Sequence, residues 1–154
     1  MTTVTIASEA PDQPETLALI EALDRYREAL YPAESNHLLD IDSLKQPEIS
    51  FFVARLDGKA VGCAALKNHG GFGEIKRMFV HPDARGNGIS HKLMAALEAE
   101  AASKDLAWIG LETGISQPEA ISLYRRSGYE ECEPFADYQP DPLSLFMRKA
   151  LQAS

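Results

Sequence analysis

The chain has 154 residues, of which 45% are hydrophobic and 25% are charged, and its formal net charge is −8. This composition is typical of an ordinary globular domain, without the low-complexity tracts of a disordered chain. The negative charge argues against nucleic acid and anionic membranes as partners, because a polyanion is bound through a basic face. No apolar run has the length of about 20 residues that a spanning helix needs, and no basic region precedes an apolar stretch at the N-terminus, so we expect a cytoplasmic protein.

The sequence has two cysteines and four histidines. Cys63 and Cys132 are too few for a disulfide scaffold, and each lies in a segment with the pattern of a strand, so we expect two buried thiols. The histidines are scattered, without the spacing of metal ligands and without a cysteine nearby. We therefore expect no structural metal.

The first part of the chain predicts a short strand at residues 3–7 and a helix at residues 15–30. Apolar side chains in the helix recur close to the 3.6-residue period, and its opposite face is charged. The segment 31–47 is polar and contains prolines, so we expect a loop with one helical turn near residues 40–44. Such loops often shape a functional site.

Three strands are predicted next, at residues 50–56, 59–66 and 74–80. All three are apolar and partly β-branched, and Asp57-Gly58 between the first two is a strong hairpin signal. We expect consecutive antiparallel pairing.

The last part of the chain predicts a helix at residues 87–104, a strand at 106–112, a helix at 118–127 ended by Gly128, and a strand at 143–149. The complete order is β, α, β, β, β, α, β, α, β. This order favours a mixed sheet with helices packed on its faces.

The segment RGNGIS, residues 85–90, lies between a predicted strand and the start of a predicted helix. Unpaired N–H groups and the helix dipole attract anions at such a position. Gly86 and Gly88 permit positive φ angles and leave room for phosphate oxygens, while Arg85 adds a fixed positive charge. An isolated Gly-x-Gly is more often a simple turn, but the arginine before it and the helix directly after it favour a pyrophosphate-binding loop.

Two common nucleotide-binding loops lack their required residues here. A dinucleotide fingerprint needs a third glycine three residues after Gly88, where the sequence has His91, and a P-loop needs Gly-Lys-Ser/Thr after four intervening residues. We therefore set aside a nucleotide-binding protein of another kind.

The segment KRMFVHPDARGNGIS resembles the coenzyme-binding signature of the GNAT superfamily of N-acetyltransferases, usually written Gln/Arg-x-x-Gly-x-Gly/Ala. Arg85, Gly88 and Ser90 occupy its defining positions, and Ser90 departs from the usual Gly or Ala. Downstream, QPEAISLYRRSGYEE is similar to the family's Asn-x-x-Ala-x-x-Leu-Tyr-x-x-x-Gly-Phe segment, with Gln117 in place of Asn and Tyr129 in place of Phe. Two motifs at the correct separation are more specific than either alone.

The similarity covers residues 3–149 and implies the GNAT acyl-CoA N-acyltransferase fold. This is an α/β (mixed α+β) fold with a central mixed, mostly antiparallel sheet flanked by helices, here in a single N-acetyltransferase domain over residues 1–154. The resemblance implies an enzyme that transfers the acetyl group of acetyl-CoA, its co-substrate, to a primary amine of a small molecule or peptide. A noncatalytic module that binds or senses acyl-CoA is the alternative. Homodimers are common among relatives, and on that ground alone we expect one.

The resemblance also assigns residues to the cofactor. The strand at 74–80 offers its backbone to the pantetheine arm at Met78, Phe79 and Val80, and Gln117 is a further contact. The pyrophosphate is held chiefly by main-chain N–H groups of the loop residues, which are Arg85, Gly86, Asn87, Gly88, Ile89 and Ser90.

Amine acetylation needs a neutral acceptor nitrogen and a proton for the departing thiolate. Tyr124 matches the family's usual proton donor, and the other interpretation is an aromatic residue that packs its helix onto the sheet. Glu74 opens its strand where some family members carry a general base, acting directly or through water. Glu112 is a second candidate for the base, and a solvated surface charge is the alternative for Glu74.

By analogy with the family, segments 31–38 and 134–142 form the walls of the acceptor pocket. Their tyrosines and carboxylates make the predicted lining acidic and aromatic, which suits a cationic amine. Ordinary exposed loop residues are an equally good interpretation. The predicted substrate-binding residues are Tyr31, Glu34, Glu112 and Tyr138, with Asp137 beside the last.

Overall fold

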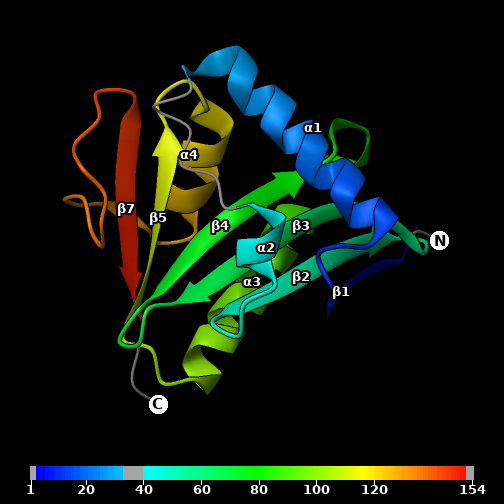
Figure 1. Cartoon of the computed structure of the whole chain (residues 1–154), viewed down its shortest axis with the longest axis horizontal. Helices are drawn as coiled ribbons and strands as arrows, with labels where there is room; N and C mark the ends of the chain where they lie inside the picture. The colour runs from blue at the N-terminus through cyan, green and yellow to red at the C-terminus, as the bar shows by residue number, and fades with distance from the viewer. Residues whose placement is uncertain (1–2, 33–39, 152–154) are drawn as a thin grey trace.

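A computed structural model describes residues 3–32 and 40–151 of the chain. The described residues form one sheet of seven strands in the order β1-β2-β3-β4-β5-β7-β6 (Figure 1). Neighbouring strands are antiparallel except β4 and β5, which run parallel. The strands are β1 (Val4–Ser8), β2 (Ile49–Leu56), β3 (Lys59–Asn68), β4 (Gly73–Val80), β5 (Trp108–Gly114), β6 (Glu130–Glu131) and β7 (Ser144–Ala150). This confirms the predicted fold class.

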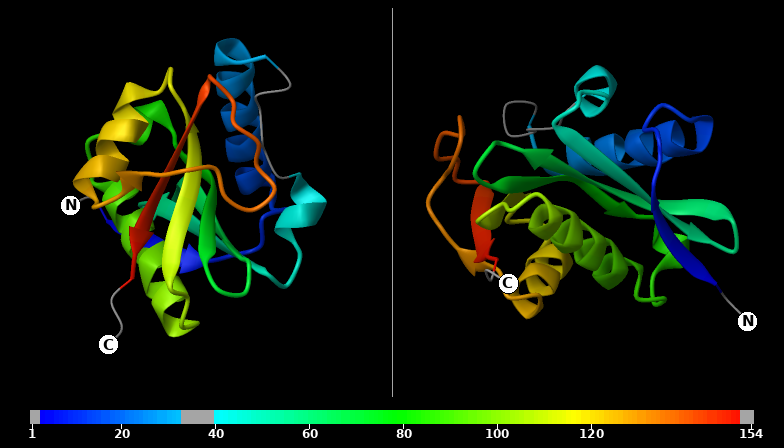
Figure 2. Two further views of the ribbon diagram at one scale, coloured as in Figure 1. Left: turned by 90° about the vertical axis from the view of Figure 1, so that its left-hand side faces the viewer. Right: turned by 90° about the horizontal axis from the view of Figure 1, so that it is seen from below.

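Helices cover both faces of the sheet (Figure 2). One face packs against α1 (Pro14–Leu30) and the short α2 (Ile41–Leu44), and the other packs against α3 (Ile89–Ser103) and α4 (Pro118–Arg126). The larger apolar cluster lies on the α3 and α4 face, and the smaller one lies beneath α1 and α2. Among the described residues, no helix is both long enough and apolar enough to cross a membrane.

Helix α3 and strand β5 each begin two residues later than the sequence predicts. Helix α3 begins at Ile89, because Gly88 has φ +71° and cannot belong to a right-handed helix. Strand β5 begins at Trp108, because Asp105 and Leu106 still complete the end of α3 through backbone bonds to Ala102 and Ala101.

The two-residue strand β6 was not predicted, since two residues are too few to show an alternating pattern. Cys132 follows β6 and is only half-buried, so the prediction of a buried thiol in a strand is wrong for it. Cys63 is buried in β3 as predicted, and burial raises the pKa of its thiol to about 12.

The parallel strands β4 and β5 separate soon after they meet. They are paired only at Gly73 with Ile109, Glu74 with Gly110, and Ile75 with Leu111. Beyond that point β4 carries an irregularity, since Arg77 has φ +55° and the register with β3 shifts between Cys63 and Ala65. The C-terminal halves of the two strands therefore diverge, as Figure 1 shows, and a gap opens in the hydrogen-bonded sheet.

The segment 132–143, which connects β6 to β7, folds back over the sheet at Gly110. The ring of Phe135 packs there, edge-on to Trp108 at a centroid distance of 5.5 Å. A Cβ atom on Gly110 would lie 2.7 Å from the Trp108 ring and 2.8 Å from the Phe135 ring. The absence of a side chain at this position lets the segment lie close to the sheet.

Gly110→Ala is expected to lower the free energy of unfolding by about 1 to 3 kcal/mol, since both rings must leave their positions. Urea denaturation of the variant measures this loss. Gly71→Ala is the matched control, because a Cβ at Gly71 would meet no atom within 4 Å. Equal stability of the two variants would show that the segment does not depend on Gly110.

Candidate active site

A long groove runs along the outer half of β4 to the start of α3. It has a volume of about 680 Å³ and is lined by the three β4 residues predicted from the resemblance, Met78, Phe79 and Val80. From α4, Ala120, Leu123 and Arg126 form the opposite wall. The groove thus occupies the space where β4 and β5 have separated.

The loop at residues 85–90, called the glycine loop below, closes one end of this groove. Gly86 and Gly88 have φ +90° and +71°, and a Cβ on either would meet open space rather than protein. Gly88 is the N-cap residue of α3 and contributes no side-chain cap, so the first N–H groups of the helix have no side-chain partner at this position. Arg85 and Ser90 line the groove at the same end. Open space, free N–H groups and a cation together suit a diphosphate.

The side chains of Asn87 and Ile89, both predicted to bind the cofactor, are engaged mainly in contacts within the protein. The amide of Asn87 donates to the Ala84 carbonyl oxygen at 2.8 Å, so this side chain closes the turn instead of facing the groove. Ile89 is 2% exposed and belongs to the main apolar cluster, although it also forms part of the groove floor.

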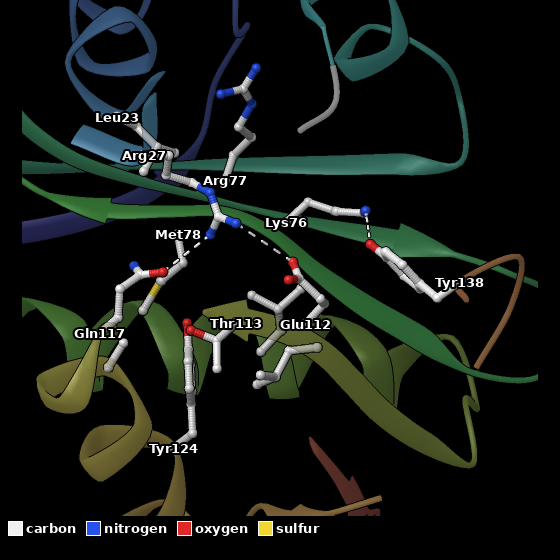
Figure 3. Close-up of a pocket in the computed structure, with 13 residues that line it drawn as sticks. Leu23, Arg27, Lys76, Arg77, Met78, Glu112, Thr113, Gln117, Tyr124 and Tyr138 are labelled. Carbon is white, nitrogen blue, oxygen red and sulfur yellow. Dashed lines mark hydrogen bonds and ion pairs between the residues drawn. The ribbon is translucent and has the colours of Figure 1, made fainter. Parts of the chain in front are cut away.

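A small cavity of about 70 Å³ adjoins the groove where β4 and β5 diverge (Figure 3). The two share lining residues Leu23, Met78, Gln117 and Ala120, so the groove leads directly into the cavity. Tyr124 and Thr113 line the cavity on one side, and Lys76 and Tyr138 line it on the other.

Tyr124, the predicted proton donor, lines the cavity and not the groove. It is 6% exposed, and burial raises the pKa of its phenol to about 12. The positive charge of Arg27 opposes this shift. The hydroxyl therefore keeps its proton at neutral pH and is available as a donor.

A buried polar cluster joins α1 to β5 beside the cavity. Arg27 donates to Gln117 Oε1 at 3.3 Å and lies 3.9 Å from Glu112 Oε1, as Figure 3 shows. Tyr31 also donates to Gln117 Oε1, at 3.2 Å, and Ser144 donates to Glu112 Oε2 at 2.7 Å. Both Arg27 and Glu112 have side chains less than a tenth exposed. Glu112 is thus an ion-paired structural carboxylate as well as a wall of the cavity.

Glu74 lies behind the cavity wall and is 1% exposed, which excludes a solvated surface charge. Its Oε1 lies 2.8 Å from His69 Nε2. Its Oε2 accepts from Tyr138 at 2.6 Å and lies 3.0 Å from Lys76 Nζ. Lys76 also donates to the Tyr138 hydroxyl.

Among residues 3–32 and 40–151, the charged residues that line the cavity are the cations Arg27, Lys76 and Arg77 and one carboxylate, Glu112, so this part of the lining is more basic than predicted. Of the predicted acceptor residues, Tyr138 lines the cavity, whereas Asp137 is exposed.

Tyr31, another predicted acceptor residue, is 5% exposed and lies behind the cavity wall. A Cβ atom on Gly114 would lie 1.7 Å from the Tyr31 hydroxyl oxygen, so a glycine is needed there. Glu34 lies outside the described residues.

Three cationic residues at the cavity were not foreseen. Arg27 follows Leu23 by four residues on the inner face of α1, where a charged residue interrupts an otherwise apolar stripe. In β4, Lys76 and Arg77 are successive polar residues that break the strand's alternation, which is a sequence signal for an irregular strand. Both patterns are present in the sequence, but neither predicts which residue the cation contacts.

Comparisons with known proteins agree with this geometry. The model of the acetyltransferase (GNAT) family matches residues 16–129. The IAA acetyltransferase of Azospirillum brasilense is 52% identical over 98% of this chain and 100% of its own. A crystal structure described as an acyl-CoA N-acyltransferase from Klebsiella pneumoniae has a TM-score of 0.82 and 43% identity, covering 97% of this chain and 99% of that one. PaiA N-acetyltransferase from Thermoplasma acidophilum, crystallised with coenzyme A, has a TM-score of 0.74 and 18% identity over 96% and 99% of the chains.

Fold and site together define an acyltransferase of the GNAT type. The chain belongs to the GNAT acetyltransferase family. It is an N-acetyltransferase, which confirms the predicted enzyme over the alternative of a noncatalytic acyl-CoA-binding module.

Arg27→Met is expected to lower the free energy of unfolding by about 3 kcal/mol, because it leaves Glu112 buried without its cationic partner. Arg25→Met, two residues away on α1, is the matched control. Its ion pair with Glu21 is 68% exposed on both sides and contributes less than about 1 kcal/mol. Guanidinium denaturation of both variants gives the comparison, and losses of similar size would mean that the Arg27 cluster does not stabilise the fold.

Proposed function

We propose that this enzyme transfers the acetyl group of acetyl-CoA to a primary amine of a small molecule or peptide, by direct attack of the amine on the thioester. The observation that supports this most is the continuous path from the glycine loop, along β4, to a cavity that holds Tyr124 and Tyr138. A donor bound along the groove and an acceptor in the cavity would meet beside Tyr124. The IAA acetyltransferase relative is consistent with a small-molecule acceptor.

The groove fits coenzyme A in shape and chemistry. The start of α3 offers N–H groups and Arg85 to the pyrophosphate, and open space at Gly86 and Gly88 lets phosphate oxygens approach the backbone. The edge of β4 that faces β5 has no strand partner near Met78 and Val80. Its peptide groups on that side are available to the amides of the pantetheine arm. The coenzyme A complex of PaiA supports the same ligand.

Tyr124 has the position and the protonation state of a donor to the departing thiolate. Its buried hydroxyl donates to negative charge as that charge develops on sulfur, in a site where water no longer competes. Arg27 favours this donation, because its positive charge stabilises the tyrosinate. Glu74, held beside Tyr138 and Lys76, is the proposed base for the acceptor nitrogen.

Gly88→Ala is expected to weaken acetyl-CoA binding at least about tenfold, because the new methyl group enters the open space meant for phosphate and strains a left-handed residue. Gly58→Ala is the control, since Gly58 has φ +88° and equally open surroundings in the β2–β3 hairpin, away from the groove. Thermal-shift titrations with acetyl-CoA, CoA and NAD measure binding, and wild type at 100 times Kd gains about 2.7 kcal/mol. Stabilisation by NAD and not by either CoA species would contradict the proposed ligand.

Tyr124→Phe is expected to lower kcat about 100-fold with little change in acetyl-CoA binding, because only the donated proton is removed. Tyr129→Phe is the matched control: its ring packs edge-on to Tyr124 at 6.1 Å, and the family segment carries phenylalanine at that position. Release of CoA thiol with a panel of primary amines measures turnover. Full turnover by Tyr124→Phe would remove the donor role.

A further inference from the structure

The carboxylate of Glu74 has no direct access to the cavity. Its side chain is 2% exposed, and the cavity is lined instead by the two residues in front of it, Lys76 and Tyr138. A general base has to lie within hydrogen-bond reach of the proton that it removes. An acceptor amine in the cavity therefore meets the Tyr138 hydroxyl before it meets Glu74.

Tyr138, Glu74 and His69 form a row of three side chains joined by short polar contacts. Tyr138 donates to Glu74 Oε2 at 2.6 Å, and Glu74 Oε1 lies 2.8 Å from His69 Nε2. The His69 side chain is 17% exposed, so this end of the row reaches solvent. The row thus connects the cavity to the outside of the molecule.

The imidazole of His69 is held in a fixed orientation. It stacks on Phe72 at a centroid distance of 4.5 Å, and Phe72 stacks on Trp108 at 4.1 Å. Phe135, which precedes Tyr138 in the segment 132–143, packs edge-on to both of these rings. The same aromatic cluster therefore positions both ends of the row.

We propose that the proton of the acceptor amine leaves the active site through Tyr138, Glu74 and His69, with Tyr138 in contact with the acceptor and His69 delivering the proton to solvent. This inference rests on the proposed amine acetylation. It differs from direct or water-mediated deprotonation by Glu74, because it assigns one residue on each side of the carboxylate.

Acetylation removes two protons from the acceptor ammonium: one leaves through Tyr138, Glu74 and His69, and the other, lost from nitrogen after its attack, replaces the proton that Tyr124 gives to the thiolate. An N–H bond of the acceptor ammonium breaks as its proton bonds to Tyr138 Oη, and the proton that Tyr138 already donates passes to Glu74 Oε2. With the ring proton of His69 on Nδ1, Nε2 has a lone pair, and after the carboxyl group turns it takes this proton, which restores the carboxylate and forms an imidazolium. The imidazolium releases its Nδ1 proton to water, and exchange of the remaining ring proton with solvent restores the Nδ1–H tautomer for the next turnover. The amine keeps the electron pair that attacks the thioester.

Charges around the row favour this direction. Burial and then the nearby charge of Glu74 raise the pKa of Tyr138, so the tyrosinate is disfavoured. Tyr138 therefore gives up its proton only as it receives another, and it remains a neutral phenol. Lys76 Nζ lies 3.0 Å from Glu74 Oε2, so the carboxylate at the centre of the row is ion-paired. A proton that reaches Glu74 therefore needs an exit, which His69 provides.

The test measures single-turnover acetyl transfer with enzyme in excess over acetyl-CoA. The acceptor is whichever of spermidine, tyramine, lysine and a lysine-containing tetrapeptide the wild type acetylates fastest. His69→Gln keeps a polar side chain beside Glu74 but cannot pass a proton on, so its rate is expected to fall about 100-fold. His69→Ala is expected to be equally slow and to be accelerated at least about tenfold by added imidazole, as proton transfer by a freely diffusing base allows.

Tyr138→Phe tests the order in which the three residues pass the proton. It interrupts the path on the cavity side of Glu74, so its rate is expected to fall without acceleration by imidazole. His81→Ala is the matched control, because His81 is half-exposed and its side chain accepts from the Asp83 N–H within its own turn. Its transfer rate is expected not to respond to imidazole. Thermal unfolding and acetyl-CoA binding confirm that each variant is folded.

Several results would overturn the inference. A wild-type rate in His69→Gln would show that His69 only holds Glu74 in place, and a folded His69→Ala that imidazole leaves slow would exclude proton exit through this position. Acceleration of Tyr138→Phe by imidazole would exclude the order of the residues. If the wild type acetylates an amine but the variants give one of these contradicting results, the proton path is wrong and the proposed function stands. If the wild type binds acetyl-CoA and acetylates no amine, the proposed function is wrong and the row with it.

Discussion

The site depends on one interruption of the sheet, the loss of pairing between β4 and β5 beyond Ile75 and Leu111. A parallel pair normally continues to the strand ends, and unpaired buried peptide groups are costly. Here the irregularity at Arg77 turns β4 away, so its free edge faces a groove instead of β5. An extended ligand with its own amide groups restores the lost pairing, which makes the missing hydrogen bonds of the sheet a binding determinant.

Two buried arginines keep the strands apart. Arg77 forms an ion pair with Asp24 of α1, and Arg27 of the same helix reaches Gln117 and Glu112 on the β5 side. Buried ion pairs gain little net stability over apolar packing, but removing one partner is strongly destabilising. Helix α1 is therefore tied to both sides of the opening by contacts that are hard to rearrange. An apolar contact at the same positions would let the two strands close on each other.

Sequence patterns predicted what depends on local structure and missed what depends on distant partners. The glycine loop, the strand before it and Tyr124 follow from motifs whose spacing requires a strand, a turn and a helix in succession. The acceptor side is built instead from α1, β4, β5 and the segment 132–143, and no periodicity reveals that Tyr138 meets Glu74 across 64 residues. The described part of the lining is more basic than predicted for this reason: composition gives the charges, but only the fold decides which carboxylates face inward.

The cavity has two tyrosines whose surroundings give them opposite tasks. Burial raises the pKa of both Tyr124 and Tyr138, so neither ionises at neutral pH. Tyr124 feels the positive charge of Arg27, which favours loss of its proton to an acceptor of negative charge. Tyr138 donates to the Glu74 carboxylate and accepts from Lys76, which leaves one lone pair on its oxygen to receive a proton. Thiolate protonation and amine deprotonation therefore belong to opposite walls of the cavity, and hydrogen bonding separates the two tyrosines, because Tyr138 donates to the Glu74 carboxylate.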